Sequence, residues 1–289
     1  MAGDFMIWTF QKGITMLKRI DQLPVILTSF AYREEYFPEL DGMLASIRRH
    51  HPDWQIVTGR GPIPGYNTPT LDVESSFSST RYRWSLPVSL DLNGTQNDWY
   101  RIAKMKGWWI TQVWHHFRDL LGSSQNRVLW FDADGRLNGP LDFEVEPDTE
   151  CVTGVWWTDP GTPPPQHHIC GGLLLFQGAR GGIVHNILDR WTAECVRSIT
   201  LPQIRSQYLP GPDTDQCLLT DLLKEHDGDK NFVSVKLPYE KYCAIPDRQN
   251  GTVQEGALVA QRMMNEKMRA PEDRNRNWPP AEAVAPQAG

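Results

Sequence analysis

Short apolar runs and stretches of helical period alternate along the chain. Runs rich in β-branched and aromatic residues indicate buried strands at 24–30, 54–59, 127–131, 151–157, 171–178 and 232–238. Apolar residues three or four positions apart indicate helices at 34–51, 98–121, 182–199 and 213–226. Asp98 is the predicted N-cap of the second of these helices, and Asp213 or Thr214 that of the last. The first strand, helix and strand form a βαβ unit, so we predict an α/β fold with a mostly parallel central sheet and helices on its faces.

Three stretches show neither the apolar runs of strands nor the periodicity of helices. Residues 59–98 are rich in Gly, Pro, Ser and Asn, which predicts a long loop carrying the basic and aromatic sequence RYRW at 81–84. The Pro-rich residues 159–168 indicate a second loop, and the Pro- and Ala-rich residues 271–289 a disordered tail. We therefore expect a single domain over residues 22–270.

Composition narrows the possible classes of protein. The chain has 289 residues, 40% of them hydrophobic and 22% charged, which is typical of a globular protein. Its net charge of −6 argues against an overall electrostatic footprint for polyanions. The five cysteines are widely spaced, without a CxxC pair, which favours reduced thiols over a disulfide framework or a zinc cage. Gln11 and Lys12 break the first apolar stretch, and no apolar run reaches the roughly 18 residues of a spanning helix, so we expect a cytoplasmic protein without a membrane partner.

The stretch VLWFDADGRLNGPLD, residues 128–142, carries the candidate chemistry. Asp132 and Asp134 follow a hydrophobic strand at its carboxyl end, where open α/β sheets bind their ligands. In extended backbone both side chains project to one side while Ala133 points away, so the two carboxylates repel each other unless a cation lies between them. Oxygen ligands suit Mg²⁺ or Mn²⁺, so we predict that both aspartates bind such a metal.

The same stretch resembles the DxD segment of GT-A fold glycosyltransferases, most closely the glycogenin and galactosyltransferase-like group. Four further segments resemble that family in the same order along the chain. They are the first strand PVILTSFAY, the helix segment YRIAKMKGW, and the pair CGGLLLFQG and DTDQCLLTDLL. The resemblance implies a Rossmann-like GT-A domain with a nucleotide-sugar-binding half at 22–135 and an acceptor half at 136–270. It also implies transfer of a hexose from a nucleoside-diphosphate sugar, with a UDP-sugar as the first candidate, to a hydroxyl acceptor.

The resemblance assigns roles to individual positions. The implied donor-binding residues are Thr28, Phe30, Tyr32, Arg101, Lys104, Ala133, Gly171, Gly172 and Gln216. The first three would hold the base, the two basic residues would contact phosphate or sugar, and the glycines would let the backbone approach the sugar closely. Asp215 and Gln216 would face the acceptor or the sugar hydroxyls.

One departure from the family pattern leaves the metal site incomplete. Metal-dependent retaining members supply a third ligand from a C-terminal His, whereas this chain has no His after His226. The corresponding segment offers Arg262, Asn265, Glu266, Lys267 and Arg269. The third ligand and the stereochemistry therefore stay open. An inverting enzyme would need a carboxylate base, for which Asp213 and Asp215 are the candidates.

Two other classes of protein fit parts of the sequence. FDADGRL resembles the first motif of haloacid-dehalogenase phosphatases, in which Asp132 would attack phosphorus and Asp134 would act as general acid with Mg²⁺ bound. A non-catalytic sugar- or nucleotide-binding module would suit the twelve tryptophans but would leave the ordered acidic motifs unexplained. For a transferase, the acceptor could be a glycan, a protein hydroxyl or a hydroxymethylated base of DNA, because aromatic residues can stack on a flipped base.

Overall fold

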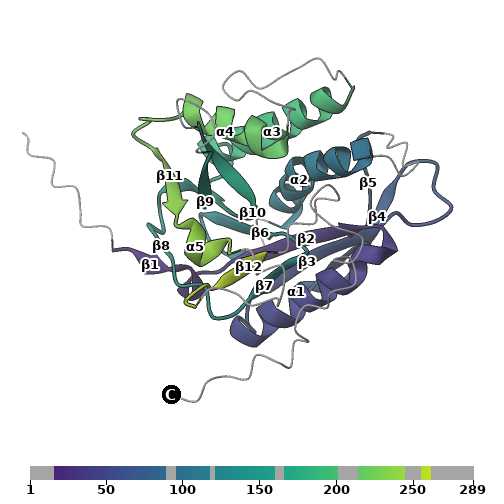
Figure 1. Ribbon diagram of the computed structural model, residues 1–289, viewed down its shortest axis with the longest axis horizontal. Helices are drawn as coiled ribbons and strands as arrows, with labels where there is room; N and C mark the ends of the chain where they lie inside the picture. Colours follow the sequence, from purple (N-terminus) through teal and green to yellow (C-terminus); the bar gives the residue numbers. More distant parts are fainter. Residues whose placement is uncertain are drawn as a thin grey trace, which may run out of the picture.

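The computed structural model describes residues 16–88, 96–117, 121–159, 166–200, 214–244 and 255–261 (Figure 1). Its strands are β1 (Lys18–Arg19), β2 (Ile26–Tyr32), β3 (Gln55–Gly61), β4 (Thr70–Ser75), β5 (Ser78–Ser85), β6 (Asn126–Phe131), β7 (Gly135–Leu137), β8 (Glu144–Val145), β9 (Glu150–Asp159), β10 (Gln166–Gly178), β11 (Phe232–Leu237) and β12 (Val259–Gln261). Its α-helices are α1 (Phe37–His50), α2 (Gln96–Phe117), α3 (Ile183–Thr200), α4 (Asp215–Glu225) and α5 (Tyr239–Tyr242). None of the helices in these ranges is both long and apolar enough to cross a bilayer.

Within the described ranges, eight strands form one central sheet in the order β11-β9-β10-β6-β2-β3-β4-β5. All of them run in one direction except β4 and β10, each of which is antiparallel to both of its neighbours. The predicted α/β fold with a mostly parallel sheet is therefore confirmed, with two reversed strands that make the sheet mixed.

Helices cover both faces of this sheet, α1 on one side and α2, α3 and α4 on the other (Figure 1). The alternation within β6 shows why its sequence is apolar from Val128 to Phe131. Val128 and Trp130 pack into the core beneath α2 and α3, whereas Leu129 and Phe131 pack into the core beneath α1. A strand that is buried on both faces needs apolar residues at successive positions.

Residues 59–98 differ from the predicted long loop. They contain the antiparallel hairpin of β4 and β5, with Thr70 paired with Ser85. In β5, Trp84 is buried in the core, while Arg81 is exposed and pairs with Asp72 and Glu74. The loop prediction was wrong because one face of this edge strand carries Ser, Thr and Arg, so the strand lacks an apolar run.

The predicted helix boundaries are largely correct. Thr214 is the N-cap of α4, because its hydroxyl accepts from the backbone N–H of Cys217 at 3.2 Å. Asp98 does not cap α2, which begins at Gln96 and continues through Gly107. The predicted tail, Asp213, the segment from Arg262 to Arg269 and most of the Pro-rich loop lie outside the described residues.

Candidate functional site

The site lies where β6 ends and meets a bulge in β10. The backbone N–H of Asp132 donates to the carbonyl of Gly172 at 2.9 Å, which holds the first carboxylate against β10. The N–H of Gly135 then donates to the carbonyl of Asp132 at 2.8 Å, and this tight turn carries Asp134 before β7 begins. Trp130 donates its indole N–H to Oδ1 of Asp132 at 2.7 Å. The chain direction and these bonds place both carboxylates at the carboxyl end of β6, as predicted.

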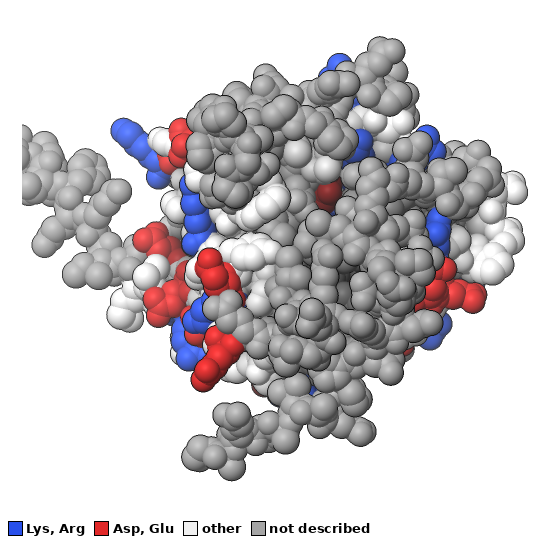
Figure 2. Space-filling view, in the orientation of Figure 1, with Lys and Arg blue, Asp and Glu red and all other residues white. Residues whose placement is uncertain are grey.

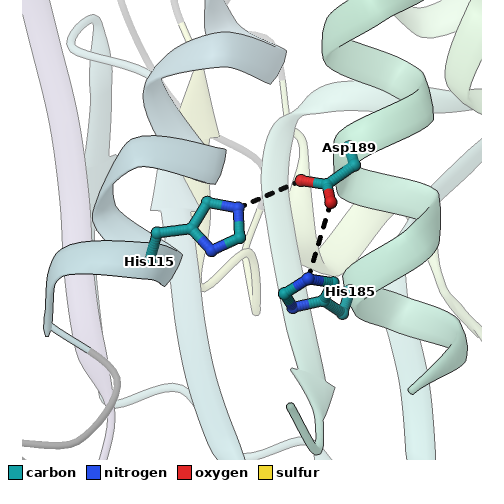
Figure 3. A group of neighbouring side chains, drawn as sticks. All are labelled: His115, His185 and Asp189. Carbon is teal, nitrogen blue, oxygen red and sulfur yellow. Dashed lines mark hydrogen bonds and ion pairs between the residues drawn. The ribbon is translucent and has the colours of Figure 1, made fainter. Parts of the chain in front are cut away.

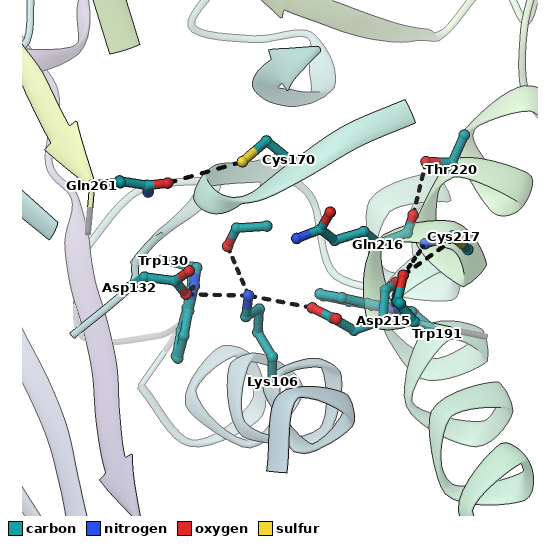
Figure 4. A network of polar contacts seen from close by, with 12 residues as sticks. Lys106, Trp130, Asp132, Cys170, Trp191, Asp215, Gln216, Cys217, Thr220 and Gln261 are labelled. Carbon is teal, nitrogen blue, oxygen red and sulfur yellow. Dashed lines mark hydrogen bonds and ion pairs between the residues drawn. The ribbon is translucent and has the colours of Figure 1, made fainter. Parts of the chain in front are cut away.

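The cation beside Asp132 is Lys106 of α2. Its Nζ lies 3.1 Å from Oδ1 of Asp132 and 3.2 Å from Oδ2 of Asp215, and it donates to the carbonyl of Gly171 at 2.9 Å (Figure 4). The Lys106 side chain is 8% exposed, so these contacts hold the ammonium group largely away from water. Burial alone would lower the pKa of Lys106, but the two carboxylates outweigh it and raise that pKa above its usual value.

The bulge in β10 brings backbone carbonyls to this lysine. The register with β9 shifts between Ile169 and Leu174, so the intervening residues leave the ladder. A Cβ on Gly171 would lie 2.6 Å from Nζ of Lys106, and a Cβ on Gly172 would lie 1.6 Å from Nε2 of Gln261. A side chain at either position would therefore displace Lys106 or Gln261 from its present place.

Asp215 provides the second carboxylate from the first residue of α4. It is 3% exposed, and its backbone carbonyl accepts from the indole N–H of Trp191 at 2.8 Å. Burial raises the pKa of Asp215, the charge of Lys106 lowers it, and Asp132 raises it again, with a net upward shift. The following residue, Gln216, extends its side chain toward Gly171 (Figure 4).

The surroundings of Asp134 suit a cation. Burial raises the pKa of Asp134 well above its usual value, and the charges of Asp132 and Glu39 raise it further. Glu39 is itself paired with Arg136 at 2.9 Å. The charges of Lys106 and Arg136 offset part of this rise. The carboxylate oxygens of Asp132 and Asp134 are of the ligand type that a hard divalent cation such as Mg²⁺ or Mn²⁺ prefers. Asp132 and Asp134 would hold it.

The residues predicted for the base lie in the interior. Thr28 has no exposed surface, and its hydroxyl donates to the carbonyl of Val57 at 2.9 Å and accepts from the indole of Trp109 at 2.7 Å. Phe30 is 8% exposed and Tyr32 is 3% exposed. In this structure Thr28 is therefore a core residue, and its role toward a base stays a prediction. All seven residues of β2 are buried, which the apolar run of the strand indicates but its assignment to a base does not take into account.

The helix residues predicted to contact the donor point away from Lys106, and their role stays a prediction. At 100° per residue, Lys104 points about 160° away from Lys106 around α2, and Arg101 about 140° away. Neither lies in the described cluster, whereas Lys106, which was not among the predicted site residues, is at its centre. The sequence does contain an indication that Lys106 is buried. Ile102, Trp109 and Ile110 lie three or four positions from it, so Lys106 lies on an apolar face of the helix. Ala133, between the two aspartates, packs against the core beneath α1.

A second polar cluster joins α2 to α3. His115, His185 and Asp189 bring three possible metal-ligand atoms within 4.8 Å of one another (Figure 3). Asp189 accepts from Nε2 of His115 at 3.0 Å and pairs with Nε2 of His185 at 3.5 Å. Because the Trp114 indole donates to Nδ1 of His185, the proton of that ring lies on Nε2, facing the carboxylate. The cluster is therefore a hydrogen-bonded bridge between two helices.

Comparisons with known proteins find similarity to solved structures. No family model matches the chain, and no curated protein matches it. A similar solved structure is described as the crystal structure of a glycosyltransferase involved in the glycosylation of the major capsid of PBCV-1. The two chains are 11% identical with a TM-score of 0.45, and the match covers 90% of this chain and 98% of that chain. At this level of similarity, that protein's activity does not transfer to this chain.

Proposed function

We propose that this protein is a metal-dependent glycosyltransferase that moves a hexose from a nucleoside-diphosphate sugar, with a UDP-sugar as the first candidate, to a hydroxyl acceptor. One observation supports this above the others. Lys106 joins a carboxylate at the end of a central strand to a carboxylate at the start of a helix. A diphosphate donor needs positive charge beside metal-binding carboxylates, and this arrangement supplies both at one edge of the sheet.

The donor side is formed by Asp132, Asp134 and Lys106. Held by the two aspartates, a divalent cation would supply Lewis acidity toward the diphosphate oxygens. The ammonium group of Lys106 adds a fixed positive charge that is already desolvated, so it needs little reorganisation when negative charge develops on the leaving diphosphate. The carbonyl of Gly171 orients that ammonium group.

The acceptor side is formed by Asp215 and Gln216. Burial and Asp132 raise the pKa of the Asp215 carboxyl group, while the charge of Lys106 lowers it. In an inverting reaction Asp215 would accept the proton of the acceptor hydroxyl, which requires such a base. A retaining reaction would need no base there, and Asp215 would then position Lys106 and a sugar hydroxyl. The anomeric configuration of the product, read by NMR, separates these two roles.

The acceptor class favoured by charge is a glycan or a protein hydroxyl over nucleic acid. On the face shown in Figure 2, Lys and Arg side chains of the described residues appear in separate places, those at the left beside Asp and Glu side chains. Arg81 of the RYRW segment is already paired with Asp72 and Glu74. A nucleic-acid acceptor would be revealed by DNA binding that weakens steeply with salt.

The test is calorimetric titration of UDP, GDP, UDP-glucose, UDP-galactose and UDP-N-acetylglucosamine, with and without Mn²⁺. We expect one nucleotide series to bind only with metal, and Asp134→Asn to abolish that binding. Asp72→Asn is the matched control, because it removes a carboxylate from an ion pair on β4, at the other end of the sheet, and should bind like wild type.

Two outcomes would contradict the proposal. Hydrolysis of a phosphomonoester by the wild type, without nucleotide binding, would instead indicate a phosphatase with Asp132 as nucleophile. Sugar-nucleotide binding that needs no metal and leads to no transfer would indicate a binding module.

A further inference from the structure

Two cysteine side chains meet beside the candidate site. Sγ of Cys170, in the β10 bulge, lies 3.4 Å from Sγ of Cys243, which directly follows α5, although 73 positions separate them in the chain. Sγ of Cys243 also lies 3.0 Å from Oε1 of Gln261. Cys170 lies 3.9 Å from the same oxygen (Figure 4). Cys170 is partly exposed, whereas Cys243 is buried.

The other three cysteines have different surroundings. Cys151 and Cys195 are buried, and Cys217 is bonded to the Thr214 hydroxyl. Burial raises the pKa of all three thiols, that of Cys151 to about 11. In contrast, the hydrogen bond from Cys243 lowers the pKa of Cys170 despite burial. The thiolate is the reactive form of cysteine. Cys170 is therefore the candidate reactive thiol, because it contacts a second sulfur, is partly exposed and has a lowered pKa.

We propose that Cys170 and Cys243 form a redox-active dithiol that closes to an intramolecular disulfide on reaction with a hydroperoxide. The Cys170 thiolate attacks one peroxide oxygen, the O–O bond breaks, and a sulfenic acid and hydroxide result. Cys243 then attacks that sulfur, so the S–S bond forms, the S–O bond breaks and water leaves. In total, two thiols lose two electrons and two protons, and one molecule of hydrogen peroxide becomes two of water.

Closure would act on the candidate site through the β10 bulge. The sulfur atoms must approach from 3.4 Å to the roughly 2.05 Å of a disulfide. The next two residues, Gly171 and Gly172, supply the carbonyls that accept from Lys106 and from the backbone of Asp132. Moving Cys170 therefore shifts the groups that orient the central ammonium group. If the proposed function holds, the oxidised protein should bind the nucleotide sugar at least several-fold more weakly than the reduced protein.

The test is to titrate the reduced full chain with hydrogen peroxide, alkylate it under denaturing conditions and map its peptides by mass spectrometry. We expect the five thiols to fall to three, with one peptide pair linking Cys170 to Cys243, and dithiothreitol to restore all five. In Cys243→Ser the reaction should stop at the sulfenic acid of Cys170, which dimedone traps. Cys217→Ser should behave like wild type.

A second measurement needs no variant. In the native reduced protein, iodoacetamide should label Cys170 before the other four cysteines. Equal labelling rates, a linkage through any other cysteine, or mixed intermolecular products would overturn the proposal. Failure of the reduced protein to bind any nucleotide sugar would refute the proposed function, while the disulfide result would stand or fall separately.

Discussion

Replacing Lys106 with Met would leave Asp132 and Asp215 without their shared cation. At 3.2 Å and an effective dielectric constant of 20, the ion pair with Asp215 corresponds to about 5 kcal/mol of Coulomb energy. Desolvation of the lysine offsets part of this, and breaking a buried pair from one side typically costs about 3–5 kcal/mol. Asp132 is 31% exposed, so its pair adds about 1 kcal/mol or less. We therefore expect Lys106→Met to lower the free energy of unfolding by about 3–5 kcal/mol at pH 8.

This loss should shrink as the pH falls. Lys106 lowers the pKa of Asp215, so without it burial and Asp132 raise that pKa still further. A carboxyl group whose pKa is higher in the folded than in the unfolded protein binds more protons when folded, so acid favours the folded variant. The difference from wild type should therefore be smaller at pH 5 than at pH 8.

The assay is urea unfolding of wild type, Lys106→Met, Asp215→Asn and the double variant at both pH values. The double variant should recover much of the stability lost in Lys106→Met, because no buried carboxylate then remains unpaired in α4. Lys241→Met is the matched control, because its pair with Asp142 is more than one third exposed and should be worth about 1 kcal/mol or less. A loss below about 1 kcal/mol for Lys106→Met, unchanged between pH 8 and pH 5, would refute the buried ion-pair network.

Three further predictions follow from other groups. Burial lowers the pKa of His51 to about 4, and its Nε2 accepts a hydrogen bond from the backbone N–H of Leu141. Between pH 6.5 and 4, His51 is therefore protonated in the unfolded chain but not in the folded one. Stability should fall by up to about 3 kcal/mol from pH 6.5 to 4, and His51→Gln should flatten that profile in urea unfolding. The raised pKa of Asp134 means that metal-free protein loses stability as pH rises through it. In thermal scans, Asp134→Asn should remove this pH-dependent loss of stability. The same substitution should also remove any rise in Tm that Mn²⁺ causes. Gly172→Ala should destabilise by about 1–3 kcal/mol because its methyl group meets Gln261, and Gln261→Ala should relieve part of that loss.

Local patterns in the sequence were enough to predict much of the framework. The apolar run of β6 predicts a strand buried on both faces, and the structure packs its alternate residues into two cores. The polar residues after that strand predict carboxylates at its carboxyl end, and Thr214 predicts the start of α4. These features depend on residues that are close in the sequence, because helix period, strand alternation and capping act over a few positions.

Only the tertiary structure decided which groups meet at the site. Lys106 bonds to the carbonyl of Gly171 across 65 positions, and Cys170 meets Cys243 across 73. Periodicity indicates that Lys106 lies on an apolar helix face, but not that a buried carboxylate from α4 compensates its charge. Likewise, Gly171 and Gly172 of β10 indicate that another group lies close to the backbone there, but the sequence does not identify Lys106 and Gln261 as those groups. Such contacts are selected by the packing of whole elements, because a buried charge is stable only where the fold brings its partners within hydrogen-bonding distance.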